Sequence, residues 1–198
     1  MKTNNERRKN IIGIIGENAS GKTTMTDYLV KKYNAATVRF SDMLADVLDR
    51  LYLKKTRANL QILSTILRQN FSEDIMSHVV IQDIKKKNHS LIVAEGIRRP
   101  SDTVYLRTFE NFYLLYIAAE EQTRFERLKN RAEKTDDAQK TWEDFQKEGK
   151  QESEQKIKEI AQQANFIIDN NGTREEFYTH IDAVMSKLSL HTLPDEKK

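Results

Sequence analysis

The chain has 198 residues, of which 32% are charged and 38% hydrophobic, so it is long enough for one sizeable core with small insertions. Its 33 basic and 30 acidic residues give a net charge of +3, which argues against a dedicated nucleic-acid binder. The lack of cysteine excludes structural disulfides and thiolate metal sites, and the lack of a long apolar run excludes a signal peptide and a membrane span, so we expect a cytoplasmic protein.

Five short runs, rich in branched or aromatic residues and apolar on both faces, predict the strands of a covered parallel sheet. They span residues 11–15, 36–40, 91–95, 112–118 and 166–168. Helices are expected over residues 22–33, 43–53, 57–71, 73–87, 120–133, 142–163 and 174–188. This alternation of strands and helices predicts an α/β layer fold.

The turn after the first strand matches the pattern G-x-x-x-x-G-K-S/T through Gly16, Gly21, Lys22 and Thr23. Glycines let successive backbone N–H groups point inward, and the following helix N-terminus adds positive potential where phosphates bind. We expect Lys22 to reach the β- and γ-phosphates of ATP and the Thr23 hydroxyl to help hold Mg²⁺. The predicted nucleotide contacts in this loop are Gly16, Glu17, Asn18, Ala19, Ser20, Gly21, Lys22, Thr23 and Thr24. The alternative is a glycine turn before a helix, with Lys22 solvated.

The rest of the chain narrows the class of nucleotide-binding protein. The guanine motif N-K-x-D of GTPases is absent, and a D-x-x-G string, residues 169–172, follows the last strand. The chain is too short for the sensor and motor segments of AAA+ and helicase ATPases. Two charged helical insertions, before the third strand and after the fourth, favour a kinase that closes two lids over two phosphorylated ligands.

The first insertion carries a polar stripe at helical spacing, in which Arg57, Gln61 and Arg68 could grip the phosphate and base of a substrate. A solvated helix face is the alternative interpretation. Asp42 follows the second strand, and open α/β sheets bind ligands at the carboxyl ends of their strands. Its carboxylate could orient an acceptor oxygen, accept its proton, or cap the next helix in competition with Ser41.

The third strand ends at Glu95, and Arg98 and Arg99 follow closely. An acidic residue at the end of a buried strand beside the phosphate loop can order water around Mg²⁺. A buried charge at Glu95 without such a partner would be costly, which disfavours a purely structural role. The two arginines are expected to face an anionic substrate.

The second insertion places Arg124, Arg127 and Arg131 on one helix face. Arginines there could stack on adenine and neutralise charge on the transferring phosphoryl group, with Arg127 and Arg131 favoured for this role. Surface ion pairs, such as Glu120 with Arg124, are the alternative.

Several segments together resemble the nucleoside monophosphate kinase-like branch of P-loop kinases, which includes adenylate kinase and dephospho-CoA kinase. They are the phosphate loop, FSDML, VAEGIRR, RFERLKNR and IIDNNGT, and the likeness runs from about residue 11 to residue 185. A largely archaeal family of adenylate-kinase-like proteins shares the EGIR, RFERL and NNGT–EEF segments. The resemblance implies a three-layer P-loop fold with five parallel strands in the order 2-3-1-4-5. It also implies a loop with Asn171 and Gly172 that passes beside the adenine.

On this resemblance, residues 11–190 form one kinase domain, with an acceptor-binding insertion over residues 42–88 and a lid over residues 120–163, while residues 1–10 and 191–198 are expected to be disordered. We expect an ATP- and Mg²⁺-dependent kinase, monomeric or homodimeric, whose small acceptor already carries a phosphate. The expected catalytic residues are Lys22, Asp42, Arg127 and Arg131. The expected acceptor contacts are Asp42, Arg57, Gln61, Arg68, Arg98 and Arg99. The expected metal-site residues are Thr23 and Glu95. A nucleoside or deoxynucleoside monophosphate is preferred over dephospho-CoA as the acceptor, and an ATP-binding switch with slow hydrolysis is the non-metabolic alternative.

Overall fold

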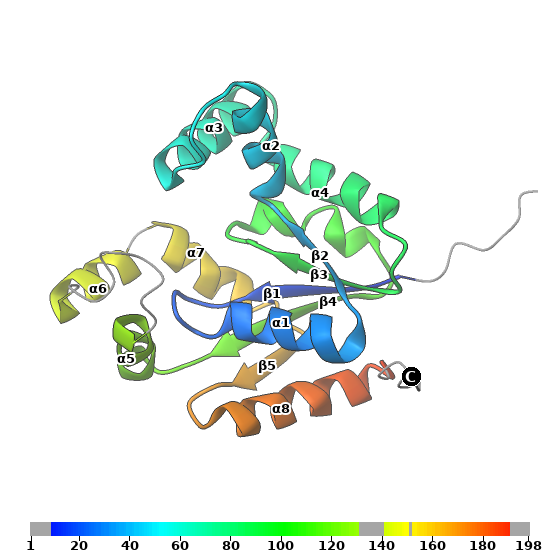
Figure 1. Ribbon diagram of the computed structural model, residues 1–198, viewed down its shortest axis with the longest axis vertical. Helices are drawn as coiled ribbons and strands as arrows, with labels where there is room; N and C mark the ends of the chain where they lie inside the picture. Colours follow the sequence, from blue (N-terminus) through cyan, green and yellow to red (C-terminus); the bar gives the residue numbers. More distant parts are fainter. Residues whose placement is uncertain (1–8, 131–140, 151, 191–198) are drawn as a thin grey trace, which may run out of the picture.

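The computed structural model describes residues 9–130, 141–150 and 152–190, and a parallel five-stranded sheet lies at its centre (Figure 1). The strands are β1 (Asn10–Ile15), β2 (Ala36–Arg39), β3 (Leu91–Glu95), β4 (Phe112–Ala118) and β5 (Phe166–Asp169). Their order is β2-β3-β1-β4-β5, and every pairing is parallel. The predicted fold class and strand order are therefore confirmed.

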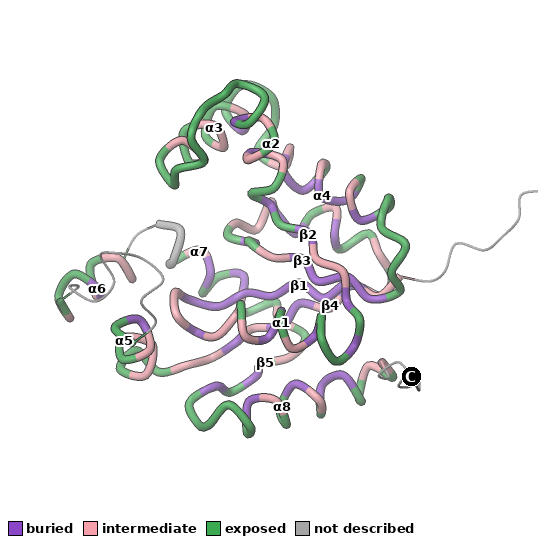
Figure 2. Tube along the Cα trace, viewed as in Figure 1, coloured by how far each residue is buried: buried purple, intermediate pink, exposed green. Residues whose placement is uncertain are grey.

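Helices cover both faces of the sheet. The covering helices are α1 (Lys22–Tyr33) and α8 (Arg174–Lys187) on one face, and α4 (Ile75–Lys86) and α7 (Glu152–Ala161) on the other. Successive side chains of β1 point to opposite faces: Ile12 and Ile14 join the core under α1 and α8, whereas Ile11 and Ile15 join the other core. Figure 2 shows the resulting burial of the central strands, which is typical of parallel sheets.

Two helical projections follow the carboxyl ends of strands (Figure 1). The first, which we call the arm, consists of α2 (Asp42–Arg50) and α3 (Arg57–Asn70). The second, which we call the lid, consists of α5 (Glu121–Asn130) and α6 (Trp142–Gly149). The leucines of α3 pack against the core as a partly buried stripe, whereas Phe71, just after α3, is 73% exposed.

Two predicted helices differ from the structure. The single helix expected over residues 142–163 is wrong, because α6 ends at Gly149 and α7 starts at Glu152. Glycine loses more backbone entropy in a helix interior than any other residue, which favours an end at this position. The helix expected over residues 43–53 ends earlier, at Arg50, and Tyr52 takes a left-handed φ of 57°, a conformation common just beyond helix ends.

Between β3 and β4 the chain forms two short 3₁₀ helices that the sequence patterns did not predict, η1 (Pro100–Thr103) and η2 (Leu106–Thr108). At the N-terminal end, residues 9 and 10 are ordered rather than disordered. Asn10 begins β1, and the Lys9 ammonium donates to the backbone oxygens of Ile84 at 2.9 Å and Lys85 at 2.8 Å. The remaining residues predicted to be disordered lie outside the described ranges. Within those ranges, no helix is both long and apolar enough to cross a lipid bilayer.

Candidate active site

The phosphate loop, residues 16–24, consists of the turn after β1 and the first three residues of α1. Gly21 forms the N-cap of α1 with a left-handed φ of 107°, a conformation that strains any side chain. A Cβ at Gly21 would also collide with the Asn170 Nδ2, which donates to the Ser20 backbone oxygen at 2.7 Å. A Cβ at Gly16 would lie 2.5 Å from the Ser20 Oγ. Both glycines of the motif are therefore required by close packing.

The side chains of Lys22 and Glu17 contact different parts of the protein. The Lys22 ammonium donates to the backbone oxygens of Gly16 and Glu17, both at 2.7 Å. The buried Glu17 carboxylate accepts from the Tyr116 hydroxyl, 3.0 Å from each of its oxygens. Burial and the neighbouring Glu17 raise the pKa of Tyr116 to about 12, so its hydroxyl remains a donor at neutral pH. The Glu17 carboxylate is therefore used inside the protein, where it faces Tyr116.

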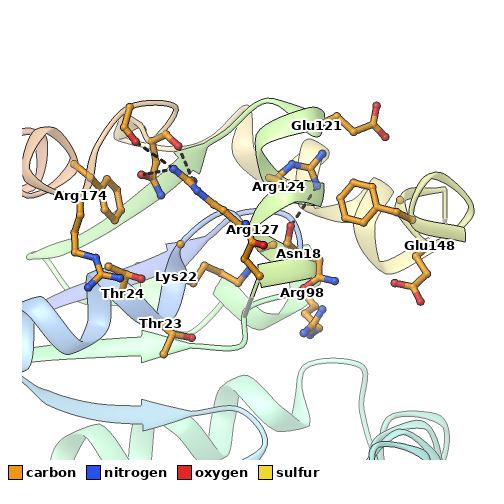
Figure 3. A pocket seen from close by; sticks show the side chains of 18 of the residues that line it. Asn18, Lys22, Thr23, Thr24, Arg98, Glu121, Arg124, Arg127, Glu148 and Arg174 are labelled. Carbon is orange, nitrogen blue, oxygen red and sulfur yellow. Dashed lines mark hydrogen bonds between the residues drawn. The ribbon is translucent and has the colours of Figure 1, made fainter. Parts of the chain in front are cut away.

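A pocket of about 930 Å³ opens beside the loop, between the arm and the lid (Figure 3). This volume is at the upper end of the range of small-molecule sites, roughly 300–1,000 Å³. Among the described residues, six basic side chains line it: Lys22, Arg57, Arg98, Arg124, Arg127 and Arg174. Two acidic side chains, Glu121 and Glu148, also line the pocket and offset part of this positive charge. The excess of positive charge suits ligands that carry phosphate.

The pocket brings together ten of the residues that the sequence predicted as site residues. They are Asn18, Ala19, Gly21, Lys22, Thr23, Thr24, Arg57, Arg98, Arg127 and Gly172. These residues come from the phosphate loop, α3, the segment after β3, α5 and the loop after β5, so four different connections of the sheet converge with the arm at one place.

Of the four predicted acceptor arginines, two reach the pocket and two do not. Arg57 is the first residue of α3, and Arg98 follows β3, so they approach from two different elements. Arg99 instead pairs with Glu73, with 3.0 Å between the Nη1 and Oε1 atoms. Gln61 is exposed and is not part of the pocket lining.

The structure corrects the prediction for Arg68 and gives Asp42 a local contact. Arg68 is buried, and its Nη2 lies 2.6 Å from the Asp102 Oδ1, so its guanidinium is used inside the protein rather than on a substrate. Asp42 begins α2, and its carboxylate accepts from the backbone N–H of Arg39 at 3.1 Å. That contact closes the turn between β2 and α2, outside the pocket lining.

The lid contacts both the phosphate loop and the loop after β5. Arg127 donates from its Nη1 to the Asn170 backbone oxygen at 2.7 Å, and from its Nη2 to the Gly172 backbone oxygen at 3.4 Å. Burial lowers the pKa of Arg127 from its ordinary value. Arg124 donates to the Asn18 backbone oxygen at 3.4 Å, and its guanidinium lies 5.4 Å from the centroid of the Phe145 ring. The predicted catalytic Arg131 lies outside the described residues.

The loop after β5 closes the far side of the pocket. Asn170 and Gly172 line it, whereas the Asn171 side chain accepts from the Glu120 backbone N–H at 2.7 Å and donates to the Asp169 carboxylate at 2.6 Å. Asn171 therefore joins this loop to the start of the lid and does not face the pocket.

The two residues predicted for the metal differ in their surroundings. Thr23 lines the pocket beside Lys22. The Glu95 Oε2 accepts from the Arg39 Nε at 2.6 Å, while its Oε1 is buried without a hydrogen-bond partner among the described residues. An orphaned carboxylate oxygen is costly, and a water molecule in the shell of Mg²⁺ would satisfy it. In the described part of the chain no group of three or more His, Cys, Asp or Glu side chains could hold a metal, and Mg²⁺ bound with nucleotide phosphates needs only one or two protein ligands.

Several pocket residues were missed by the sequence predictions. Arg174 opens α8, where Thr173 and Glu176 form a capping box; that pattern predicts the start of the helix but not the place of Arg174 in the pocket. Phe145 and Phe177 are buried aromatic residues that also line the pocket. No sequence signal distinguishes an aromatic residue in a pocket wall from one in an ordinary core.

Comparison with known proteins gives the same fold and a family. A family model described as an AAA domain matches residues 15–146, from the phosphate loop into α6. A UPF0200 protein of Methanocaldococcus jannaschii is 27% identical over 190 residues, which cover 95% of this chain and 94% of the relative. A UPF0200 protein of Pyrococcus horikoshii is 28% identical over 183 residues, with 90% of this chain and 97% of the relative covered. The expected likeness to an archaeal family is therefore confirmed.

Solved structures of small-molecule kinases share the fold at low identity. A shikimate kinase from Bacteroides thetaiotaomicron superposes with a TM-score of 0.61 at 14% identity, covering 91% of this chain and 99% of that one. A gluconokinase from Sinorhizobium meliloti gives a TM-score of 0.54 at 12% identity, covering 92% and 97%. A dephospho-CoA kinase from Campylobacter jejuni gives 0.53 at 15% identity, covering 91% and 98%. The chain therefore has a P-loop kinase-like fold.

Proposed function

Because the chain belongs to the AAA domain family and has a P-loop kinase-like fold, we propose that it is an ATP-dependent phosphotransferase that acts on a small, already phosphorylated acceptor. One observation carries the proposal: Arg57 and Arg98 line the same pocket as Lys22 and Thr23. Nucleoside and deoxynucleoside monophosphates are the acceptors that we place first.

The charge distribution supports two anionic ligands in one pocket. The phosphate loop and Lys22 form one cationic region, suited to the triphosphate of ATP. Arg57 and Arg98 come from other elements, the arm and the segment after β3. Guanidinium groups match the oxygen geometry of phosphate in a bidentate way, so two of them suit a phosphorylated acceptor. Arg68, which is buried against Asp102, does not belong to this set.

The reaction is an in-line transfer. An oxygen of the acceptor forms a bond to the γ-phosphorus of ATP, the bond from that phosphorus to the β–γ bridging oxygen breaks, and ADP leaves with the electron pair. A phosphate oxygen of a nucleoside monophosphate carries no proton that must be removed at neutral pH. The chain's own contribution is positioning and charge: Lys22, Arg124 and Arg127 line the pocket around the transferring group.

Thr23 and Glu95 are the residues that would hold Mg²⁺, the first through its hydroxyl and the second through bound water. The orphaned Glu95 Oε1 is the feature that fits this role. Bound Mg²⁺ supplies positive charge that neutralises the β- and γ-phosphates. The partner of the other oxygen, Arg39, orients the Glu95 carboxylate.

The test measures ADP release from Mg·ATP with and without a panel of acceptors. The panel contains nucleoside monophosphates, deoxynucleoside monophosphates, dephospho-CoA, shikimate and gluconate. We expect strong stimulation by one nucleoside or deoxynucleoside monophosphate, lost in Lys22→Ala and weakened through a higher acceptor KM in Arg57→Met. Stimulation by shikimate or gluconate alone would contradict the proposal that the acceptor is already phosphorylated, although the protein would still be a kinase.

Dephospho-CoA is the second candidate acceptor, because a dephospho-CoA kinase shares the fold and because the segment IIDNNGT resembles that group. An ATP-binding switch is the candidate outside metabolism. It is favoured by the contacts of Arg127, whose guanidinium is held by oxygens of Asn170 and Gly172. Tight ATP binding with slow hydrolysis that no acceptor stimulates would support the switch.

A further inference from the structure

We propose that the buried ion pair of Arg68 and Asp102 is the joint that positions both acceptor arginines, Arg57 and Arg98. Arg68 lies at the end of α3, and Asp102 lies in η1, the 3₁₀ helix after β3. Neither side chain lines the pocket. The inference rests on the proposed function, because it assigns an acceptor to the two arginines, and it makes Arg68 and Asp102 positioning residues.

The Asp102 carboxylate connects two segments with its two oxygens. Its Oδ1 accepts from the Arg68 Nη2 at 2.6 Å. Its Oδ2 accepts from the backbone N–H groups of Arg98 at 2.9 Å and Arg99 at 3.0 Å. One carboxylate thus binds both a guanidinium of the arm and the backbone of Arg98, whose side chain extends into the pocket.

The Arg68 guanidinium extends the joint to the start of α4. Its Nη1 donates to the Glu73 backbone oxygen and, at 3.4 Å, to the Ser101 hydroxyl. Glu73 in turn pairs with Arg99 at 3.0 Å. The end of α3, the turn before α4 and η1 therefore meet at one buried guanidinium.

Arg57 is coupled to this joint through the helix itself. It is the first residue of α3, eleven positions before Arg68, which corresponds to about 16 Å along a helix axis. The rest of α3 is held mainly by a stripe of partly buried leucines, and Arg68 is its buried residue. Because a helix is stiff over this length, a shift at Arg68 moves Arg57 relative to Arg98.

The pair is better explained by geometry than by stability. The side chains of Arg68 and Asp102 are only 6% and 2% exposed, and the Arg68 Nε has no hydrogen-bond partner among the described residues. Burying two charges carries a desolvation penalty that often cancels their attraction, and apolar replacements are frequently as stable. The charged pair is instead accounted for by its geometry, because it fixes the distance between the arm and the segment after β3.

The experiment compares four variants of the full-length protein with the wild type. Arg68→Met leaves the Asp102 charge without its partner, and Arg68→Lys keeps the positive charge without the two-pronged guanidinium. The double variant Arg68→Met with Asp102→Asn removes both charges, so no unpaired charge is left buried and the protein is expected to fold. The matched control is Lys32→Met, which breaks the ion pair of Lys32 with Asp182, 2.7 Å long, on the α1–α8 side of the sheet. Steady-state kinetics give the KM of the acceptor and the KM of ATP separately.

We expect the double variant to raise the acceptor KM about 10-fold to 100-fold, as for other misplaced binding groups, with the ATP KM within about twofold of wild type. Arg68→Lys is expected to restore part of the acceptor affinity, and Lys32→Met to change neither KM. An unchanged acceptor KM in the folded double variant, or an equal rise of both KM values, would overturn the inference.

Hydrogen exchange separates this inference from the proposed function, because it needs no acceptor. In the double variant we expect faster exchange of the amides over residues 97–103 and also over residues 57–61, at the far end of α3, and no change in Lys32→Met. Fast exchange confined to the immediate surroundings of residues 68 and 102 would overturn the joint. If the wild type phosphorylates no acceptor while exchange changes as expected, the proposed function fails and the joint stands.

Discussion

Gly21→Ala tests whether the phosphate loop and the loop after β5 are locked together as the structure indicates. Gly21 has a φ of 107°, and a Cβ there would collide with the Asn170 side-chain nitrogen. Asn170 is buried, and that nitrogen donates to the Ser20 backbone oxygen at 2.7 Å. The methyl group therefore strains the backbone and displaces a buried hydrogen-bond donor at the same time.

The two effects can be added to an expected magnitude. A left-handed conformation costs a non-glycine residue roughly 1–2 kcal/mol. Loss of the buried hydrogen bond of Asn170 leaves an unsatisfied polar group, which costs roughly 1–3 kcal/mol. We therefore expect Gly21→Ala to lower the free energy of unfolding by about 2–5 kcal/mol and to weaken ATP binding, because the loop can no longer keep its shape.

The assay is urea denaturation followed by circular dichroism, with ATP titrations on the folded variants. Gly149→Ala is the matched control, since nothing lies within 4 Å of a Cβ at that position in α6 and alanine is the better helix residue. It should be neutral or stabilising by up to about 1 kcal/mol. A double-mutant cycle with Asn170→Ala measures the coupling of the two loops. Wild-type stability of Gly21→Ala, or strict additivity in the cycle, would refute the reasoning.

Three further predictions concern other contacts. Lys22→Ala should lower acceptor-stimulated ADP release by about 10²- to 10³-fold, without a matching loss in thermal stability, because it removes charge from the transferring phosphate. Tyr116→Phe should lower the free energy of unfolding in urea by roughly 1–3 kcal/mol, because the buried Glu17 carboxylate loses its hydrogen-bond donor. In a protein that already carries Glu17→Gln, Tyr116→Phe should cost less, because a neutral amide tolerates the loss of the donor better than a carboxylate. Burial raises the pKa of Asp182, but hydrogen bonds from Lys32 and from the two tyrosine hydroxyls beside it outweigh this effect and lower the pKa below 3.8. Its stabilising contribution is present above that value and lost as pH falls through the folded pKa, so acid titration of unfolding should show a shallower decline in Asp182→Asn than in wild type.

The fold could be predicted because its signals are local. Runs of branched residues such as Ile11–Ile15 occur where both faces of a parallel strand are covered, and the structure starts β1 only one residue earlier. The spacing of Gly16, Gly21 and Lys22 reports a backbone conformation, and that conformation is what the structure contains. Helix ends were less predictable, because a single glycine such as Gly149 favours a helix end without requiring one.

The acceptor side was harder to predict because helical spacing says which residues share a face, not what the face meets. Arg57 and Arg68 belong to the same polar stripe, yet one lines the pocket and the other is buried. The difference comes from Asp102, 34 residues further along the chain, which no local pattern connects to Arg68. Arg174 was missed for a similar reason, since its place in the pocket depends on the loop that precedes α8.

The aromatic residues of the lid have a practical consequence for solution work. The chain contains a single tryptophan, Trp142, at the start of α6. Its ring centroid lies 5.1 Å from that of Phe125 and 5.9 Å from that of Phe145, and Phe145 also lines the pocket. Indole fluorescence depends on the polarity and packing around the ring, so a ligand that moves Phe145 changes the emission of this one fluorophore. Lid movements and ligand affinities can therefore be followed in the unlabelled protein, before any acceptor has been identified.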